Sequence, residues 1–260
     1  MALNIADYVV TEAGFGADLG AEKFLNIKCR KSGLWPSCAV LVATVRGIAH
    51  HGPSLEVGMS NIRKHVENLR KFKLPVVVAI NRFTQDTEAD LKFVQDFCKT
   101  QLNVDCVVNS SWAEGSAGSE GLGKAVIKIC STSAATKAEF LYPDNIPLIE
   151  KLRTIAKELY GAKDIDMDPA VLQKLKQYED FGFGSFPVCV AKTQYSFSTD
   201  PKKLGAAMGH TLKVREVRLA AGAGFIVAVC GELMTMPGLP KVPSAEGISV
   251  DSQGKIQGLF

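Results

Sequence analysis

The sequence lacks the features of membrane, secreted and nucleic-acid-binding proteins. No apolar run reaches the 18 residues that a transmembrane helix typically needs. No basic segment opens the chain, and Asp7 follows after only six residues, so we expect no signal peptide. The 30 Lys and Arg residues outnumber the 27 Asp and Glu residues only slightly, and the excess is spread evenly. We therefore expect a cytoplasmic protein whose partners are neither nucleic acids nor membranes.

Several metal-binding and catalytic motifs are also missing. The seven cysteines include no C-x-x-C pair, and their odd number favours reduced, mostly buried thiols over disulfides or zinc ligands. There is no H-E-x-x-H and no G-x-S-x-G, which excludes zincin-type and α/β-hydrolase sites. We expect no resident metal site.

What is present is the pattern of an α/β protein. The length of 260 residues fits one large domain or two modest ones, and a hydrophobic content of 47% is typical of globular proteins. In the first part, apolar runs alternate with helical patterns. Strands that are apolar on both faces and separated by helices indicate βαβ units and a parallel sheet. The predicted strands are residues 6–11, 38–45, 76–80 and 104–108, and the predicted helices are residues 18–31, 59–72, 87–99 and 121–129.

The pattern changes after a Ser/Thr/Ala-rich stretch at residues 131–138. Beyond it we predict a smaller mixed α/β domain, with helices at residues 148–160 and 169–178 and strands at residues 187–191, 211–219 and 225–230. The predicted fold class is thus α/β: a mostly parallel sheet flanked by helices, like part of a P-loop NTPase or Rossmann fold, plus this smaller domain. We place the domains at residues 1–135 and 136–260. Because a buried strand at 6–11 would open the chain, it is either an edge strand or the continuation of a larger fold.

Two glycine-rich stretches are candidate phosphate loops. The first, around Gly14, Gly16 and Gly20, has the spacing G-x-G-x-x-x-G and leads into a helix where Asp18 would serve as N-cap. It can be a phosphate cradle, a tight turn with a cap, or a loop that contacts another part of a nucleotide. The second, residues 118–124, matches G-x-x-x-x-G-K but is followed by Ala125, which lacks the hydroxyl that ligates Mg²⁺. We interpret it as a flexible loop that places Lys124 in the first turn of a helix.

Further candidates follow the predicted strands, where α/β proteins bind their ligands. Arg46 follows one strand and is a candidate for binding phosphate or carboxylate. His50 and His51 come next, and we expect them in a solvated loop. Phe83 and Trp112 follow two further strands, and they either pack beneath loops or form a stacking platform for a flat ring.

Beyond these single features, eight stretches resemble, in order, signatures of the formate–tetrahydrofolate ligase (10-formyltetrahydrofolate synthetase) family. Each stretch alone is weak, but together they are specific. They are residues 11–24, 42–46, 75–81, 111–115, 191–198, 214–219, 234–240 and 258–260.

The resemblance implies a two-step reaction, in which ATP phosphorylates formate and tetrahydrofolate N10 then attacks the formyl phosphate. It implies that Phe83 and Trp112 stack on the folate ring, and that a loop lines the adenine end of the nucleotide. The residues of that loop are Glu12, Gly14, Phe15 and Gly16. ATP with Mg²⁺ and tetrahydrofolate are the implied substrates, and a monovalent cation is a further candidate cofactor. The resemblance assigns no catalytic residue in this chain.

The chain also departs from the family pattern. It resembles roughly the C-terminal half, without the phosphate loop and formyl-phosphate-binding residues of the N-terminal half. After Arg46 a family lysine is lost, and the segment from Gly52 to Met59 is shorter than usual. We therefore expect the chain alone not to form product at a useful rate, and its partner to be a missing N-terminal half or a second copy in a homo-oligomer. The alternative is a non-catalytic folate-binding or subunit-contact module. A small nucleotide hydrolase using residues 118–124 is disfavoured by Ala125 and Glu120.

Overall fold

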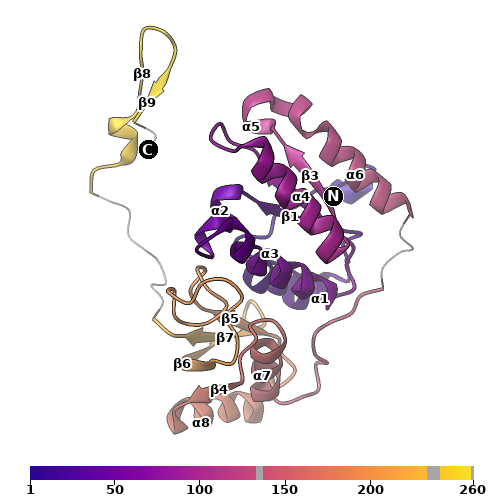
Figure 1. Cartoon of the computed structure of the whole chain (residues 1–260). Helices are drawn as coiled ribbons and strands as arrows, with labels where there is room; N and C mark the ends of the chain where they lie inside the picture. The colour runs from indigo at the N-terminus through magenta and orange to yellow at the C-terminus, as the bar shows by residue number, and fades with distance from the viewer. Residues whose placement is uncertain (133–136, 233–240, 259–260) are drawn as a thin grey trace.

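A computed structural model describes residues 1–132, 137–232 and 241–258. The fold is α/β, as predicted, with a parallel sheet of order β1-β2-β3 and a mixed sheet of order β4-β6-β7-β5 (Figure 1). Among the described residues, no helix has both the length and the apolar composition needed to cross a bilayer.

The parallel sheet forms from three short strands rich in branched apolar residues. They are β1 (Ala39–Ala43), β2 (Val76–Asn81) and β3 (Asp105–Asn109). The central strand β2 is buried along almost its whole length, whereas β1 lies at an edge and exposes Val40 and Val42. The helices around this sheet are α2 (Val45–His50), α3 (Leu55–Arg70), α4 (Glu88–Leu102), α5 (Ser111–Glu114) and α6 (Glu120–Thr132).

Local capping explains where three of these helices begin. The hydroxyls of Thr44, Ser54 and Thr87 each accept a hydrogen bond from the backbone N–H three residues further on. Each bond satisfies one of the free donors at a helix start, so the chain turns into a helix directly after the cap. The cap at Thr44 follows β1 at once and converts the segment expected to be a loop into α2.

The mixed sheet carries the second hydrophobic core. In β6 Leu212 and Val214 face inward by alternation, and an irregularity between Val214 and Glu216 shifts the register so that Val217 faces inward as well. A small hairpin, β8 (Ser249–Val250) with β9 (Ile256–Gln257), stands apart from both sheets (Figure 1). The other elements of this part are α7 (Leu148–Glu158), β4 (Asp164–Met167), α8 (Pro169–Tyr178), β5 (Val188–Ala191), β6 (Thr211–Ala220) and β7 (Phe225–Cys230).

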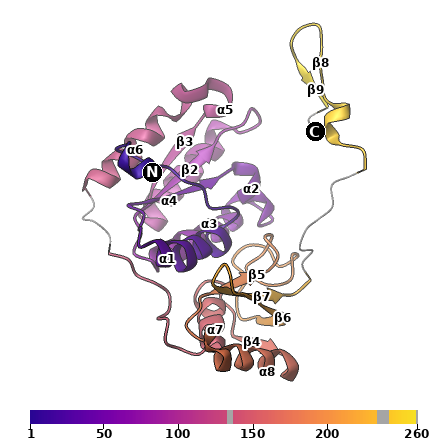
Figure 2. The ribbon, with the colours of Figure 1, turned by 180° about the vertical axis from the view of Figure 1, so that it is seen from behind.

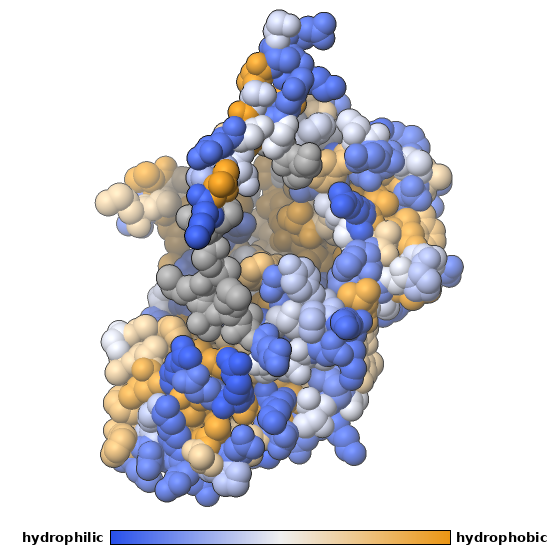
Figure 3. Space-filling view, turned by 90° about the vertical axis from the view of Figure 1, so that its left-hand side faces the viewer, coloured by the Kyte–Doolittle hydropathy of each residue, from blue (hydrophilic) through white to orange (hydrophobic). Residues whose placement is uncertain are grey.

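The first long helical segment, residues 17–32, and α3 lie between the two sheets (Figure 2). Leu25 and Phe72 are fully buried in the core of the mixed sheet, although they precede the predicted boundary. Asn68 of α3 donates a hydrogen bond from Nδ2 to the carbonyl oxygen of Leu159 at 3.0 Å. Away from this contact the surface of the mixed-sheet part mixes hydrophilic and hydrophobic side chains (Figure 3). The two parts therefore pack through buried groups and not only through the linking chain.

The prediction of a strand at residues 6–11 is wrong. No secondary structure forms there, and Val10 is 89% exposed. A strand needs a ladder partner, and among the described residues none pairs with this segment. The apolar pattern of residues 6–11 indicated a buried strand. A strand also needs a neighbouring strand to pair with, and the pattern carries no information about one.

Other expectations hold only in part. The helix at 18–31 forms, but it is wound mainly as two π-helical turns, Ala17–Ala21 and Phe24–Cys29, followed by the short α1 (Arg30–Ser32). The short acidic strand β4 was not predicted. The signature at 234–240, the last two residues of the signature at 258–260, and residues 133–136 at the predicted boundary lie outside the described residues. The division at 135/136 stays a prediction.

Lys151 is a charged residue enclosed in the second core. It is fully buried on α7, and its Nζ donates hydrogen bonds to the carbonyl oxygens of Gly184 at 2.8 Å and Phe186 at 3.0 Å. Burial lowers the pKa of Lys151 to about 8, although the carboxylates of Asp144 and Glu179 oppose this shift. Folding therefore makes the ammonium group of Lys151 easier to deprotonate, and the uncharged amine predominates only above about pH 8.

We expect the free energy of unfolding of the wild type, relative to Lys151→Met, to rise between pH 8 and pH 10.5. In this window the unfolded lysine still binds a proton that the folded one has lost. The shift corresponds to roughly 3 kcal/mol at most. Urea unfolding across this window measures the difference, with Lys157→Met, an exposed lysine of α7, as control. A difference that stays constant with pH would contradict the prediction.

Candidate functional site

The carboxyl ends of β1, β2 and β3 lie at one edge of the parallel sheet, because all three strands run in the same direction. A cavity of about 320 Å³ lies at the β1 end of this edge. Its walls come from the Phe15 turn, the end of β1, α2, α3 and the loop after β5. Segments from both parts of the chain therefore meet in one pocket. Its polar lining residues are Asp18, Thr44, His51, Asn61, His65, Gln194, Tyr195 and Ser196.

The first glycine-rich stretch forms a tight turn against this cavity. Phe15 has a φ of 61°, a left-handed conformation that is unusual for an aromatic residue, and its side chain is 78% exposed. Gly20 lies so close to the backbone of Gly14 that an added Cβ would overlap the carbonyl oxygen of Gly14. The amides of Leu19 and Gly20 both donate to the carbonyl oxygen of Gly16 at 3.0 Å. Close packing thus holds an exposed aromatic ring in a strained position.

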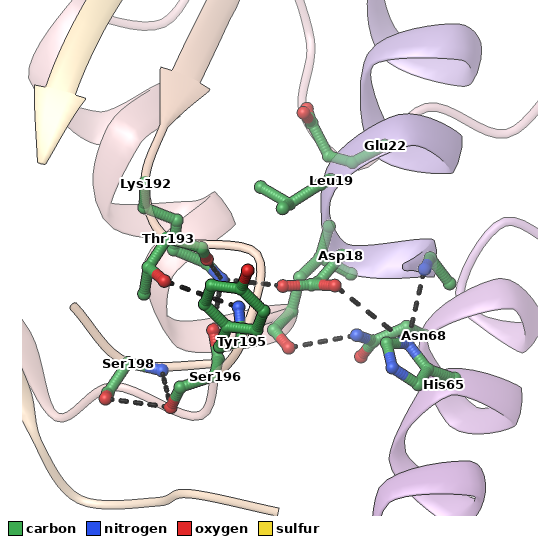
Figure 4. Close-up of polar contacts among 12 residues, drawn as sticks. Asp18, Leu19, Glu22, His65, Asn68, Lys192, Thr193, Tyr195, Ser196 and Ser198 are labelled. Atoms are coloured by element: carbon green, nitrogen blue, oxygen red, sulfur yellow. Dashed lines mark hydrogen bonds and ion pairs between the residues drawn. The ribbon is translucent and has the colours of Figure 1, made fainter. Parts of the chain in front are cut away.

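The sequence suggested that Asp18 caps the helix, but its side chain makes no capping hydrogen bond. It is buried, and its Oδ2 accepts a hydrogen bond from Lys192 Nζ at 2.8 Å (Figure 4). Lys192 follows β5, and its Nζ also donates to the carbonyl oxygens of Thr193 at 3.2 Å and Ser196 at 2.5 Å. The ion pair therefore draws the carboxylate away from the helix start and towards the other sheet.

Lys192 has all its donors engaged. Burial lowers its pKa, and the neighbouring Asp18 carboxylate opposes that shift. With three acceptors around the ammonium group, Lys192 has no N–H left for a ligand. Its role in this geometry is to hold Asp18 and the loop at Ser196.

His65 of α3 supports the same turn from the other side. Its Nδ1 accepts a hydrogen bond from the backbone N–H of Ala17 at 3.2 Å and lies 3.9 Å from Asp18 Oδ1. Burial lowers the pKa of His65, and the acceptor role assigns the proton of the neutral ring to Nε2. The ring packs on Phe197 with 4.8 Å between centroids. The Phe15 turn is thus tied to α3 through His65 and to the loop after β5 through Lys192.

The two adjacent histidines are not in a solvated loop. His50 is exposed at the end of α2, whereas His51 lines the cavity and accepts a hydrogen bond at Nδ1 from the amide of Gly205 at 3.2 Å. Burial and, secondly, His50 lower the pKa of His51. The helix directs the two rings differently, because consecutive residues lie about 100° apart around a helix axis.

Phe83 and Trp112 lie next to each other, as their positions after neighbouring strands imply. The register pairs Asn81 with Asn109 at the ends of β2 and β3, and Asn109 Nδ2 donates to Asn81 Oδ1 at 2.8 Å. The ring centroids of Phe83 and Trp112 are 5.9 Å apart with planes inclined by 48°, and Trp112 is 68% exposed. Ordinary packing beneath loops does not describe so exposed a tryptophan.

The two remaining basic candidates differ. Arg46 is exposed in the first turn of α2, and among the described residues no carboxylate pairs with it. Lys124 lies in α6, as predicted, and its Nζ is 2.6 Å from Glu120 one turn earlier. That stretch is a helix start with a surface ion pair and not a cradle of backbone amides.

His65 and Lys192 were missed as site residues by sequence reasoning. His65 lies inside a regular helix, where periodicity gives no sign of its partner. Lys192 follows the predicted strand at 187–191, so a charge directly after an apolar strand was an available signal.

The sequence of the whole chain is similar to one family of known proteins. The family described as formate–tetrahydrofolate ligase matches residues 1–260. A formate–tetrahydrofolate ligase from Methylobacterium nodulans is 53% identical over 270 residues, covering 99% of this chain and 48% of that protein. The corresponding proteins of Rhizobium meliloti and Pelagibacter ubique are 52% and 50% identical, with 100% and 99% of this chain and 48% of each relative covered. The chain, which spans about half the length of the curated relatives it matches, therefore belongs to the formate–tetrahydrofolate ligase family.

Proposed function

We propose that this chain takes part in the ATP-dependent ligation of formate to tetrahydrofolate, giving 10-formyltetrahydrofolate through formyl phosphate. The names of the relatives described above support this reaction, because those proteins are formate–tetrahydrofolate ligases. The observation that carries it is one sheet edge that holds an exposed aromatic pair after β2 and β3 and, at its β1 end, a cavity lined by both apolar and polar residues. Such an edge can hold two flat groups near each other, the pterin of tetrahydrofolate and the base of the nucleotide.

Phe83 and Trp112 are proposed to hold the pterin ring of tetrahydrofolate. The two rings contact each other in this structure, so a flat ligand either stacks on the outer face of Trp112 or enters as that exposed ring swings away. Stacking restricts the orientation of the pterin, and with it the direction from which N10 approaches the acyl phosphate. The pair acts by orientation and does not take part in proton transfer.

The cavity beside the Phe15 turn is proposed to receive the base end of the nucleotide. Its volume is at the small end of the range for ligand pockets, which suits one ring system and not a whole nucleoside triphosphate. Phe15 offers an exposed ring face, and Gln194 supplies an amide donor and acceptor. Asn61 adds its amide oxygen, because its Nδ2 already donates to the carbonyl oxygen of Gly205 at 3.3 Å. Glu12 and Gly14 precede Phe15, are exposed, and do not line the cavity, so their contact with the nucleotide would lie at its mouth. The phosphates would extend out of the cavity, and Arg46 at the start of α2 is a candidate to meet an anion there.

His65 and Lys192 are proposed as positioning residues for the Phe15 turn. Neither needs to touch substrate, since His65 holds the amide of Ala17 and Lys192 holds Asp18. Mg²⁺ belongs to the ATP substrate complex in this proposal. Among the described residues we assign no ligands to a monovalent cation.

The test of the function is reconstitution. The purified chain is incubated with ATP, Mg²⁺, formate and tetrahydrofolate, with and without the part of the Methylobacterium nodulans ligase that this chain does not match. Product is measured after acid conversion to the methenyl form. We expect product only when the complementary part is added. Folate binding without any product in either mixture would favour a non-catalytic folate-binding module instead.

For the aromatic pair, we expect Trp112→Ala and Phe83→Ala each to weaken tetrahydrofolate binding about tenfold, through lost stacking and burial. Trp112→Phe should lose less, because a ring remains. Calorimetric titration measures the affinity, with Phe181→Ala as control, since Phe181 is equally exposed but lies in the other part of the chain. Unchanged affinity in both alanine variants would remove the stacking role.

For the positioning residues, we expect His65→Leu to weaken ATP binding about tenfold, because the buried amide of Ala17 loses its acceptor. His65→Asn should restore most of the affinity, since its amide oxygen can replace Nδ1. Folate affinity should not change in either variant, which separates positioning from a general loss of structure. Lys124→Ala is the control and should leave ATP affinity unchanged with or without Mg²⁺. Equal ATP affinity in His65→Leu and the wild type would contradict the role.

A further inference from the structure

Two cysteines far apart in the sequence meet at the end of the parallel sheet opposite the candidate site. Cys38 directly precedes β1, and Cys130 lies near the end of α6. Their sulfur atoms are 3.8 Å apart, although 92 positions separate them in the chain. All seven cysteines are free thiols in this structure, but only three of them are buried, fewer than the sequence suggested.

The distance between the two sulfur atoms is short enough for a bond to form after a small movement. A disulfide needs its sulfur atoms about 2.05 Å apart, so closure from 3.8 Å requires a movement of under about 2 Å. Cys130 lies in the last turn of its helix, where small side-chain and backbone adjustments are least restrained. Both side chains are partly exposed, so a small oxidant can reach them.

We propose that Cys38 and Cys130 form a reversible disulfide when the protein meets a low-molecular-weight disulfide such as oxidised glutathione. One cysteine thiolate attacks the oxidant, which forms a mixed disulfide and releases one glutathione thiolate. The second cysteine thiolate then attacks the protein sulfur of that mixed disulfide and expels the second glutathione. The protein loses two electrons and two protons, and the oxidant gains both.

The bond would stabilise the parallel sheet without entering the candidate site. It would close a loop that contains β1, β2, β3 and the helices between them, which restricts the unfolded chain. The five residues of β1 separate Cys38 from the cavity end of the strand by about 16 Å. The segment before β1 also carries Trp35, whose ring contacts Phe140 edge-on at 5.5 Å. The disulfide would therefore form next to the segment before β1, which packs against the core of the mixed sheet through Trp35.

The rate of the reaction should depend on pH. Burial, and then the neighbouring Cys130, raise the pKa of Cys38 to about 11. The thiol form of Cys38 is therefore favoured at neutral pH, and oxidation should accelerate as the pH rises towards 9, because the thiolate is the attacking species. The bond is expected under sustained oxidation and not as a rapid response.

The test uses the full chain in glutathione buffers of increasing oxidised fraction. After alkylation of free thiols and digestion without reductant, mass spectrometry should find one cross-linked peptide pair that contains Cys38 and Cys130. The thermal midpoint should rise by about 5–10 °C and return after treatment with dithiothreitol.

Variants make the assignment specific. Cys38→Ser and Cys130→Ser should each abolish both the cross-link and the thermal shift. Cys189→Ser, which removes a partly buried cysteine of β5, should keep both. Three outcomes would overturn the proposal: two free thiols in excess oxidised glutathione, stable mixed disulfides without a cross-link, or a thermal shift that survives in both single variants.

Discussion

The ion pair between Lys192 and Asp18 joins segments that lie 174 positions apart in the sequence. Both groups are buried, so each would carry a large desolvation cost if the other were absent. Three acceptors around the ammonium group offset that cost. The pair fixes where the first helical segment meets the loop after β5, and the cavity exists because those two segments approach there.

The same constraint explains why the glycine turn is so tightly built. Asp18 is held by Lys192 of the loop after β5, and the amide of Ala17 is held by His65 of α3, so the residues before them have little freedom. The chain reaches these anchors only by a turn in which Phe15 takes a left-handed conformation and Gly20 packs against backbone. Strain of this kind persists where the surroundings over-determine it, and such places are often binding sites.

The sequence predicted the elements whose signals are local. Residues 76–80 form β2 because a run of branched apolar residues after a proline has few alternatives, and Thr87 starts its helix through its own hydroxyl. The meeting of Phe83 and Trp112 followed from a rule about parallel strands, so it too was predictable. The contacts of His65 and Lys192 were not, because a hydrogen-bond partner supplied by a distant segment leaves no periodic trace. Residues 6–11 show the converse, since their apolar pattern suits a strand but no partner pairs with them in the described residues.

The exposed edge of β1 has a consequence for how the protein behaves in solution. Val40 and Val42 face solvent, and on the outer side of β1 no described strand occupies the backbone donors and acceptors. An open edge of this kind can pair with any extended chain, including another copy of itself. Aggregation should therefore increase with protein concentration. A peptide that pairs with the edge of β1 should improve solubility and make β1 more ordered.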